Sequence, residues 1–189
     1  MLSRLSLTLL VPAVFLAGCD SEPDTAVQQQ ERLSLPKQPL IGQIDFARES
    51  TKLPDLAFTD PDGQRLELAS LEGKPVLLNL WATWCVPCVV EMPALDNLAD
   101  VIGEEVKVLT ISQDMTGAKA VEPFFAERDF RNLEPWLDES NALSRQIGGE
   151  LLPVTILFDS QGEEIFRVTG GYHWDSEEAI AAVREAIAE

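Results

Sequence analysis

Two cysteines stand three residues apart in the segment Trp84-Cys85-Val86-Pro87-Cys88. At the start of a helix this spacing puts both side chains on one face, where their sulfurs can bond. The helix N-terminus carries partial positive charge and free N–H groups, which favour a thiolate, and Pro87 fixes a helical φ where its missing N–H costs little. We predict a redox-active dithiol, with Cys85 as the exposed attacking sulfur and Cys88 as the buried resolving sulfur.

The numbers of cysteine and histidine residues in the chain limit the other possible uses of the pair. A four-cysteine zinc site fails, because the chain has three cysteines and one histidine. A static disulfide here would close a very small loop and add little stability. A two-cysteine copper(I) site stays open, because soft thiolates bind that ion. A peroxidase is a weaker alternative, since nothing around Thr83 supplies an obvious peroxide site. The motifs imply no conventional cofactor.

An acidic residue falls on the apolar side of the helix expected after the cysteines. At 100° per residue, Glu91 shares a face with Cys88, Met92 and Leu95. A buried carboxylate is costly without a partner or a task, and burial would raise its pKa toward values suited to exchanging protons with the Cys88 thiol. We predict that role; the alternative is a side chain that escapes to solvent. Asn79 cannot titrate and can serve only as a hydrogen-bonding group.

Arg4 is the only charged residue before Asp20, and it is followed by a short apolar run at residues 5–16. The run is too short to span a membrane and resembles a secretory signal. The segment Leu-Ala-Gly-Cys at residues 16–19, which ends in Cys19, resembles the lipobox of bacterial lipoproteins. The resemblance implies a signal peptide over 1–18, cleavage before Cys19 and acylation of that residue. The alternative is an ordinary cleavable signal followed by a stray cysteine.

Residues 20–52 show no sustained hydrophobic period and contain several prolines and a glutamine run. This composition is typical of a flexible linker, and about 33 such residues span roughly 30 Å. We therefore expect a lipidated cysteine and linker over 19–52 and a folded domain over 53–189. Asp20 resembles an inner-membrane retention signal. The expected location is the bacterial cell envelope, with the domain held in the periplasm.

From residue 53 onward, strand patterns alternate with helix patterns. The apolar run at residues 76–81 predicts a buried central strand. The other expected strands are 56–59, 65–68, 106–112, 154–159 and 164–168, and the expected helices are 86–102, 117–128, 141–147 and one after residue 175. This order predicts an α/β fold with a central mixed β-sheet flanked by helices.

The charge balance is strongly acidic. The chain has 14 Lys and Arg against 32 Asp and Glu, a net charge of -18. Such a chain repels polyanions, so nucleic acid is excluded as a partner. The 46% hydrophobic and 24% charged content is that of a folded globular protein.

Segment 80–88 (LWATWCVPC) resembles the active-site signature of the thioredoxin superfamily. Its continuation at residues 91–93 (EMP) is similar to the membrane-tethered TlpA/ResA-like branch, which often carries Asn at the position of Asn79. The resemblance covers about residues 53–189. It implies a thioredoxin-like fold and a thiol–disulfide oxidoreductase, in which Glu91 matches the residue that exchanges protons with the resolving cysteine.

The same resemblance assigns further site residues. Pro153 matches a cis-proline that faces the cysteine pair, and the backbone before it, at Leu152, matches the segment that pairs with an extended substrate peptide. Trp84, Val86 and Pro87 are expected to form the rim of the site with Leu152.

The direction of electron flow is predicted from the residues between the cysteines. Val86 and Pro87 supply no cation, and Glu91 is negative or neutral, so Cys85 should be less acidic and the potential of the pair low. We expect a reductant. Tethered relatives commonly reduce apocytochrome c or copper-site cysteines, which implies disulfide-bearing proteins as substrates and a membrane protein as electron donor. A copper(I)-handling or thiol-binding module without turnover, and a thiol oxidant, stay as alternatives.

Overall fold

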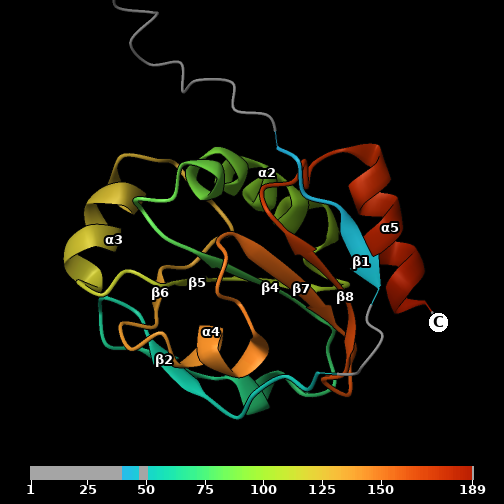
Figure 1. Cartoon of the computed structure of the whole chain (residues 1–189), viewed down its shortest axis with the longest axis horizontal. Helices are drawn as coiled ribbons and strands as arrows, with labels where there is room; N and C mark the ends of the chain where they lie inside the picture. Colours follow the sequence, from blue (N-terminus) through green and yellow to red (C-terminus); the bar gives the residue numbers. More distant parts are fainter. Residues whose placement is uncertain (1–39, 47–50, 189) are drawn as a thin grey trace, which may run out of the picture. The chain divides into compact units, whose positions relative to one another are not determined.

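The computed structural model describes residues 40–46 and 51–188, which form an eight-stranded mixed sheet with helices on both faces (Figure 1). In chain order the elements are β1 (Ile44–Phe46), β2 (Ala57–Thr59), β3 (Arg65–Glu67), the 3₁₀ helix η1 (Leu68–Leu71), β4 (Val76–Trp81), α2 (Val86–Ile102), β5 (Lys107–Ser112), α3 (Ala118–Ala126), β6 (Trp136–Leu137), α4 (Ala142–Ile147), β7 (Val154–Phe158), β8 (Glu164–Thr169) and α5 (Glu177–Ile187). The α/β class with a mixed, helix-flanked sheet is confirmed. The predicted signal peptide (1–18) and the predicted lipid site at Cys19 lie outside the described residues.

The strand order is β1-β8-β7-β4-β5-β6-β2-β3, so β4 lies in the interior of the sheet. It pairs in parallel with β5 and antiparallel with β7. All six residues of β4 are buried, because neighbouring strands and helices cover both its edges and both its faces. The central strand expected from the apolar run is therefore confirmed.

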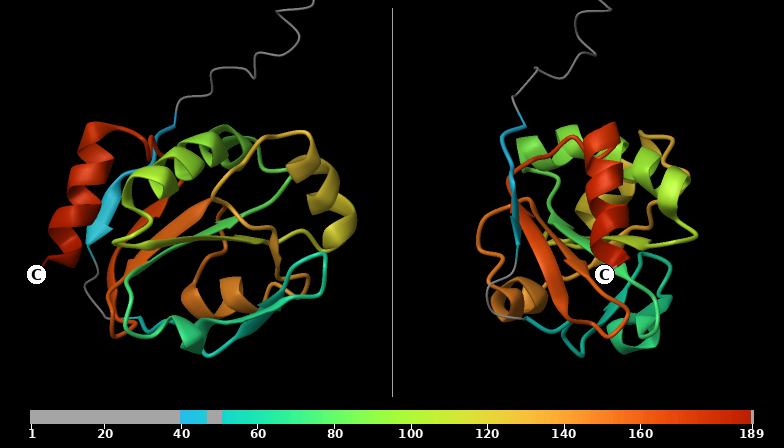
Figure 2. Two further views of the ribbon diagram at one scale, coloured as in Figure 1. Left: turned by 180° about the vertical axis from the view of Figure 1, so that it is seen from behind. Right: turned by 90° about the vertical axis from the view of Figure 1, so that its right-hand side faces the viewer.

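Two hydrophobic cores lie on the two faces of the sheet. Helices α2, α3 and α5 pack on one face, while α4 and η1 pack on the other (Figures 1 and 2). Alternation along β4 sends Leu77 and Trp81 into the first core and Leu78 and Leu80 into the second. The same alternation puts Asn79 on the face that α2 covers.

Helix α2 follows β4 after a short connection, and it begins at Val86 as predicted. Cys85 is its N-cap, and Pro87 stands in its first turn, where the missing N–H is not needed. The helix continues through Pro93 to Ile102. Its buried side chains recur every three or four residues, and this stripe includes Glu91. The helical period of the sequence therefore positions the two cysteines and the Glu91 carboxyl group relative to one another.

One strand forms where the sequence indicated a linker. β1 pairs antiparallel with β8, with Ile44 opposite Val168. A strand of three residues at the edge of a sheet takes its register from its neighbour, so it leaves no period in its own sequence. The division of the chain at residue 52 stays a prediction, but this part of the linker segment belongs to the sheet.

No helix among the described residues has the length and apolar character needed to cross a membrane.

Candidate active site

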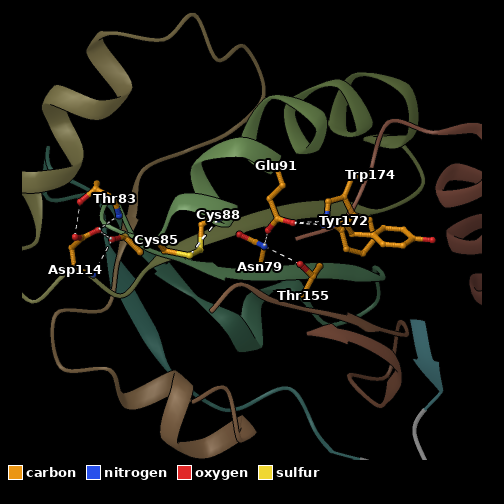
Figure 3. Close-up of a disulfide and its surroundings, with 10 residues drawn as sticks. Asn79, Thr83, Cys85, Cys88, Glu91, Asp114, Thr155, Tyr172 and Trp174 are labelled. Atoms are coloured by element: carbon orange, nitrogen blue, oxygen red, sulfur yellow. Dashed lines mark hydrogen bonds between the residues drawn. A yellow bond between two sulfur atoms is a disulfide. The ribbon is translucent and has the colours of Figure 1, made fainter. Parts of the chain in front are cut away.

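The two predicted cysteines are joined in a disulfide at the junction of β4 and α2 (Figure 3). The Cys85–Cys88 bond is 2.02 Å long, and the two Cα atoms lie 5.3 Å apart. The main-chain N–H of Cys88 points at Cys85 Sγ over 3.4 Å. When the disulfide opens, this N–H and the positive end of α2 favour a thiolate on Cys85.

The two sulfurs differ in exposure, but less than predicted. Cys88 is completely buried, as expected, whereas Cys85 is only 6% exposed and does not have the free surface predicted for it. Its chain neighbours Trp84 and Val86 are 68% and 45% exposed, so the rim rather than the sulfur itself meets solvent. Cys85 stays the more accessible of the pair.

Glu91 is fully buried, which rules out the alternative of a side chain that escapes to solvent. Its Oε1 accepts a hydrogen bond from Asn79 Nδ2 at 2.9 Å. Its Oε2 accepts from the main-chain N–H of Tyr172 at 2.9 Å and from Trp174 Nε1 at 3.3 Å (Figure 3). These donors come from β4 and from the segment between β8 and α5.

Burial controls the protonation of Glu91. Desolvation raises its pKa from 4.5 to about 7, and the hydrogen bonds from Tyr172, Asn79 and Trp174 oppose that rise without cancelling it. The predicted direction of the shift is confirmed. All three donors described for Glu91 are neutral groups, so none of them brings a positive charge that would keep the carboxyl group ionised. A carboxyl group with this pKa can accept or release a proton near neutral pH.

A second polar cluster supports the loop that leads to Cys85. Asp114, which follows β5, accepts hydrogen bonds from the main-chain N–H of Thr83 at 2.9 Å and from its hydroxyl at 2.8 Å. Ser112 Oγ donates to the same carboxylate at 2.8 Å. Sequence reasoning missed this anchor. Because β4 and β5 are parallel, their carboxyl ends meet at one edge, so the polar run after β5 was a usable signal.

The Leu152–Pro153 peptide bond is cis, as the resemblance implied. Pro153 immediately precedes Val154, which pairs with Leu80 of β4, so the proline lies at the end of the sheet from which β4 leads to the cysteines. Leu152 packs against the core that contains both cysteines, and Leu151 is 70% exposed. The cis-proline segment and the Trp84 rim therefore belong to the same end of the sheet.

The reduced pair would offer two soft thiolates to a metal ion, whereas in the disulfide each sulfur is bonded to the other. Within residues 40–46 and 51–188, no group of three or more His, Cys, Asp or Glu side chains is arranged to hold a metal ion.

A mixed sheet with a Cys-x-x-Cys disulfide at the start of the following helix defines the class of thioredoxin-fold thiol–disulfide oxidoreductases. The model of the Redoxin family matches residues 48–183. The chain therefore belongs to the Redoxin family, and it is a thiol–disulfide oxidoreductase related to ResA.

Named relatives agree with this assignment. The thiol–disulfide oxidoreductase ResA of Bacillus thuringiensis is 32% identical over 118 residues, which cover 62% of this chain and 67% of the relative. The thioredoxin-like protein YneN of Bacillus subtilis is 31% identical over 117 residues, 61% of this chain and 68% of the relative.

Solved structures confirm the thioredoxin-like fold. A candidate thiol:disulfide interchange protein DsbE from Chlorobium tepidum superposes with a TM-score of 0.65 at 23% identity, covering 77% of this chain and 99% of that one. The exposed lipoprotein thioredoxin Etrx1 of Streptococcus pneumoniae gives a TM-score of 0.60 at 25% identity, with coverage of 70% and 99%.

Proposed function

We propose that this protein reduces disulfides in extracytoplasmic proteins through the Cys85–Cys88 pair. The observation that carries the proposal is the arrangement of this pair at the positive end of α2 with the buried Glu91 carboxyl one turn behind it. The rim residues Trp84 and Val86 face solvent around the pair and are available to a protein substrate.

The reaction has two steps. The Cys85 thiolate attacks one sulfur of the target disulfide, and the other target sulfur leaves as a thiolate and takes a proton from solvent. Glu91 then accepts the proton of the Cys88 thiol, and the Cys88 thiolate attacks Cys85 Sγ. The Cys85–Cys88 bond closes, and the second target sulfur leaves with the electron pair of the mixed disulfide and takes a proton from solvent, to which Glu91 releases the proton of Cys88. The target gains two electrons and two protons, and the dithiol is oxidised.

The segment around the cis-proline holds the target during this exchange. The backbone at Leu152, just before Pro153, pairs with an extended stretch of the target, and exposed Leu151 contacts its apolar side chains. The position of this segment at the same end of the sheet as the cysteines supports the assignment.

The direction of the reaction follows from the surroundings of the sulfurs. Val86 and Pro87 place no cation between the cysteines, and Glu91 adds no positive charge. The thiolate of Cys85 is therefore less stabilised than in an oxidant, which favours the disulfide form and a reducing potential.

The proposed location is the bacterial cell envelope. The sequence ending in Cys19 supports lipidation there, and a structural relative is an exposed lipoprotein. We place the anchor in the inner membrane and the domain in the periplasm, where a membrane electron-donor protein would restore the dithiol. Apocytochrome c and copper-site cysteines are the proposed substrates.

The test is electron transfer from the reduced protein to an oxidised Cys-x-x-Cys-His peptide, the haem-attachment sequence of c-type cytochromes. We expect the peptide to gain two thiols for each Cys85–Cys88 disulfide formed, counted by alkylation and mass spectrometry. A peptide carrying the same disulfide without the histidine measures the preference for this substrate. A reduced protein that binds copper(I) tightly and leaves every disulfide intact would overturn the proposal.

A further inference from the structure

The side-chain amide of Asn79 lies fully buried on the face of β4 that α2 covers. Its Nδ2 donates two hydrogen bonds, to Glu91 Oε1 at 2.9 Å and to Thr155 Oγ1 at 2.8 Å. Both N–H groups of the amide are therefore used. The reversed orientation would set the amide oxygen against the Glu91 carboxylate, so the hydrogen bonds fix which end of the amide faces which way.

The other end of the amide has no partner in the part of the chain that the structure describes. Asn79 Oδ1 is buried and receives no hydrogen bond from any described residue. A buried acceptor without a donor is costly, and such atoms are uncommon in folded proteins. In Figure 3 this oxygen points away from Glu91, toward Cys88 at the start of α2. In the disulfide, neither sulfur carries a hydrogen that it could donate.

Reduction changes that chemistry. When an external dithiol donates two electrons and two protons, the Cys85–Cys88 bond breaks and Cys88 becomes a buried thiol. Its S–H is then a donor on the side toward which Asn79 Oδ1 points. The hydrogen bonds from Asn79 to Glu91 and Thr155 need no change in either state.

We propose that Asn79 is a positioning residue that couples the cysteine pair to Glu91. Its carbonyl oxygen accepts a hydrogen bond from the Cys88 thiol in the reduced protein, while its amino group holds the Glu91 carboxyl ready to take the same proton. This inference rests on the proposed function, because it presumes that Cys88 is the resolving thiol. The dithiol form thus gains one hydrogen bond that the disulfide form lacks.

The first test is the equilibrium of the pair with dithiothreitol in the full chain. Asn79→Leu keeps the size of the side chain and removes the acceptor, so we expect it to lower the equilibrium constant for the dithiol form about tenfold, which is about 30 mV for a two-electron couple. Thr155→Val is the matched control, because it removes a buried partner of the same amide and leaves Oδ1 in place. It should leave the equilibrium constant unchanged.

The second test is the S–H stretching band of Cys88 in the infrared spectrum of the Cys85→Ser chain. A difference spectrum against Cys85→Ser/Cys88→Ser isolates this band, because Cys19 is common to both. We expect the frequency of a hydrogen-bonded thiol, and a shift to higher frequency when Asn79→Leu is added. The frequency of an unbonded thiol with Asn79 present would overturn the inference even if the leucine variant does not fold.

The two proposals fail in different ways. If the wild-type protein reduces the Cys-x-x-Cys-His peptide but the Cys85→Ser chain shows an unbonded Cys88 thiol, the coupling by Asn79 is refuted and the proposed function stands. A wild-type protein that transfers no electrons to any disulfide would refute the proposed function itself.

Discussion

Cys85→Ser should lower the rate of insulin reduction by dithiothreitol to that of the uncatalysed reaction. The attacking atom must be a thiolate, and a serine hydroxyl does not ionise near neutral pH, even at a helix N-terminus. Cys88 cannot replace it, because Cys88 is completely buried. The rate is followed by the turbidity of precipitating insulin chains.

Cys88→Ser separates attack from resolution. This variant keeps the nucleophile but cannot close the Cys85–Cys88 bond, so it should accumulate a mixed disulfide with the insulin chain, visible on a non-reducing gel. Cys19→Ser should keep the wild-type rate. The assignment of the two sulfurs would be wrong if the Cys85 variant stayed active or if the mixed disulfide formed on Cys88.

Glu91→Gln should slow the release of the target from Cys85 about 100-fold at pH 8, the lower end of the usual contribution of a general base. The base must be ionised, and the pKa of Glu91 is raised to about 7 by burial. The wild-type rate of release should therefore rise with pH through 7. At pH 6 most of the wild-type carboxyl is already protonated, so the deficit of the variant should shrink by about tenfold.

The release step can be observed as a separate phase by using Ellman's reagent as the target. Attack by Cys85 forms a mixed disulfide and releases one coloured thiolate, and attack by Cys88 then releases a second. Stopped-flow absorbance records the second release as a phase whose rate does not depend on the concentration of the reagent. In the mixed disulfide Cys85 has no thiol to titrate, so the ratio of the two release rates reports the base that acts on Cys88. Asp96→Asn removes another buried carboxylate of α2, one that accepts main-chain N–H groups, and should leave the release rate unchanged. A rate ratio independent of pH would exclude Glu91 as the base.

The parts of the site that belong to one continuous segment were predictable from the sequence. The apolar run of β4, the Cys-x-x-Cys spacing and the 3.6-residue period of α2 set the positions of Asn79, Cys88 and Glu91 relative to one another. Local periodicity is a strong signal in such elements, because a buried strand and an amphipathic helix both need it.

The partners of that segment could not be predicted from local pattern. Tyr172 and Trp174 reach Glu91 from positions 81 and 83 residues along the chain, and their contact depends on how the segment after β8 returns to α2. The short strands β1 and β6 were missed for a related reason, since their pairing with β8, β5 and β2 joins segments that lie far apart in the sequence. The low exposure of Cys85 was not predicted either, because the residue pattern does not specify how much of a single side chain its neighbours cover.

The redox potential of the Cys85–Cys88 pair tests most directly whether this protein is a reductant. The full chain is equilibrated with glutathione buffers of graded composition, then trapped with an alkylating reagent and analysed by mass spectrometry, so that the pair is counted separately from Cys19. With no cation between the sulfurs, we predict a potential below about -200 mV, toward the value of about -270 mV known for thioredoxin. A potential near about -120 mV, the value of a strong thiol oxidant, would contradict the proposed direction of electron flow.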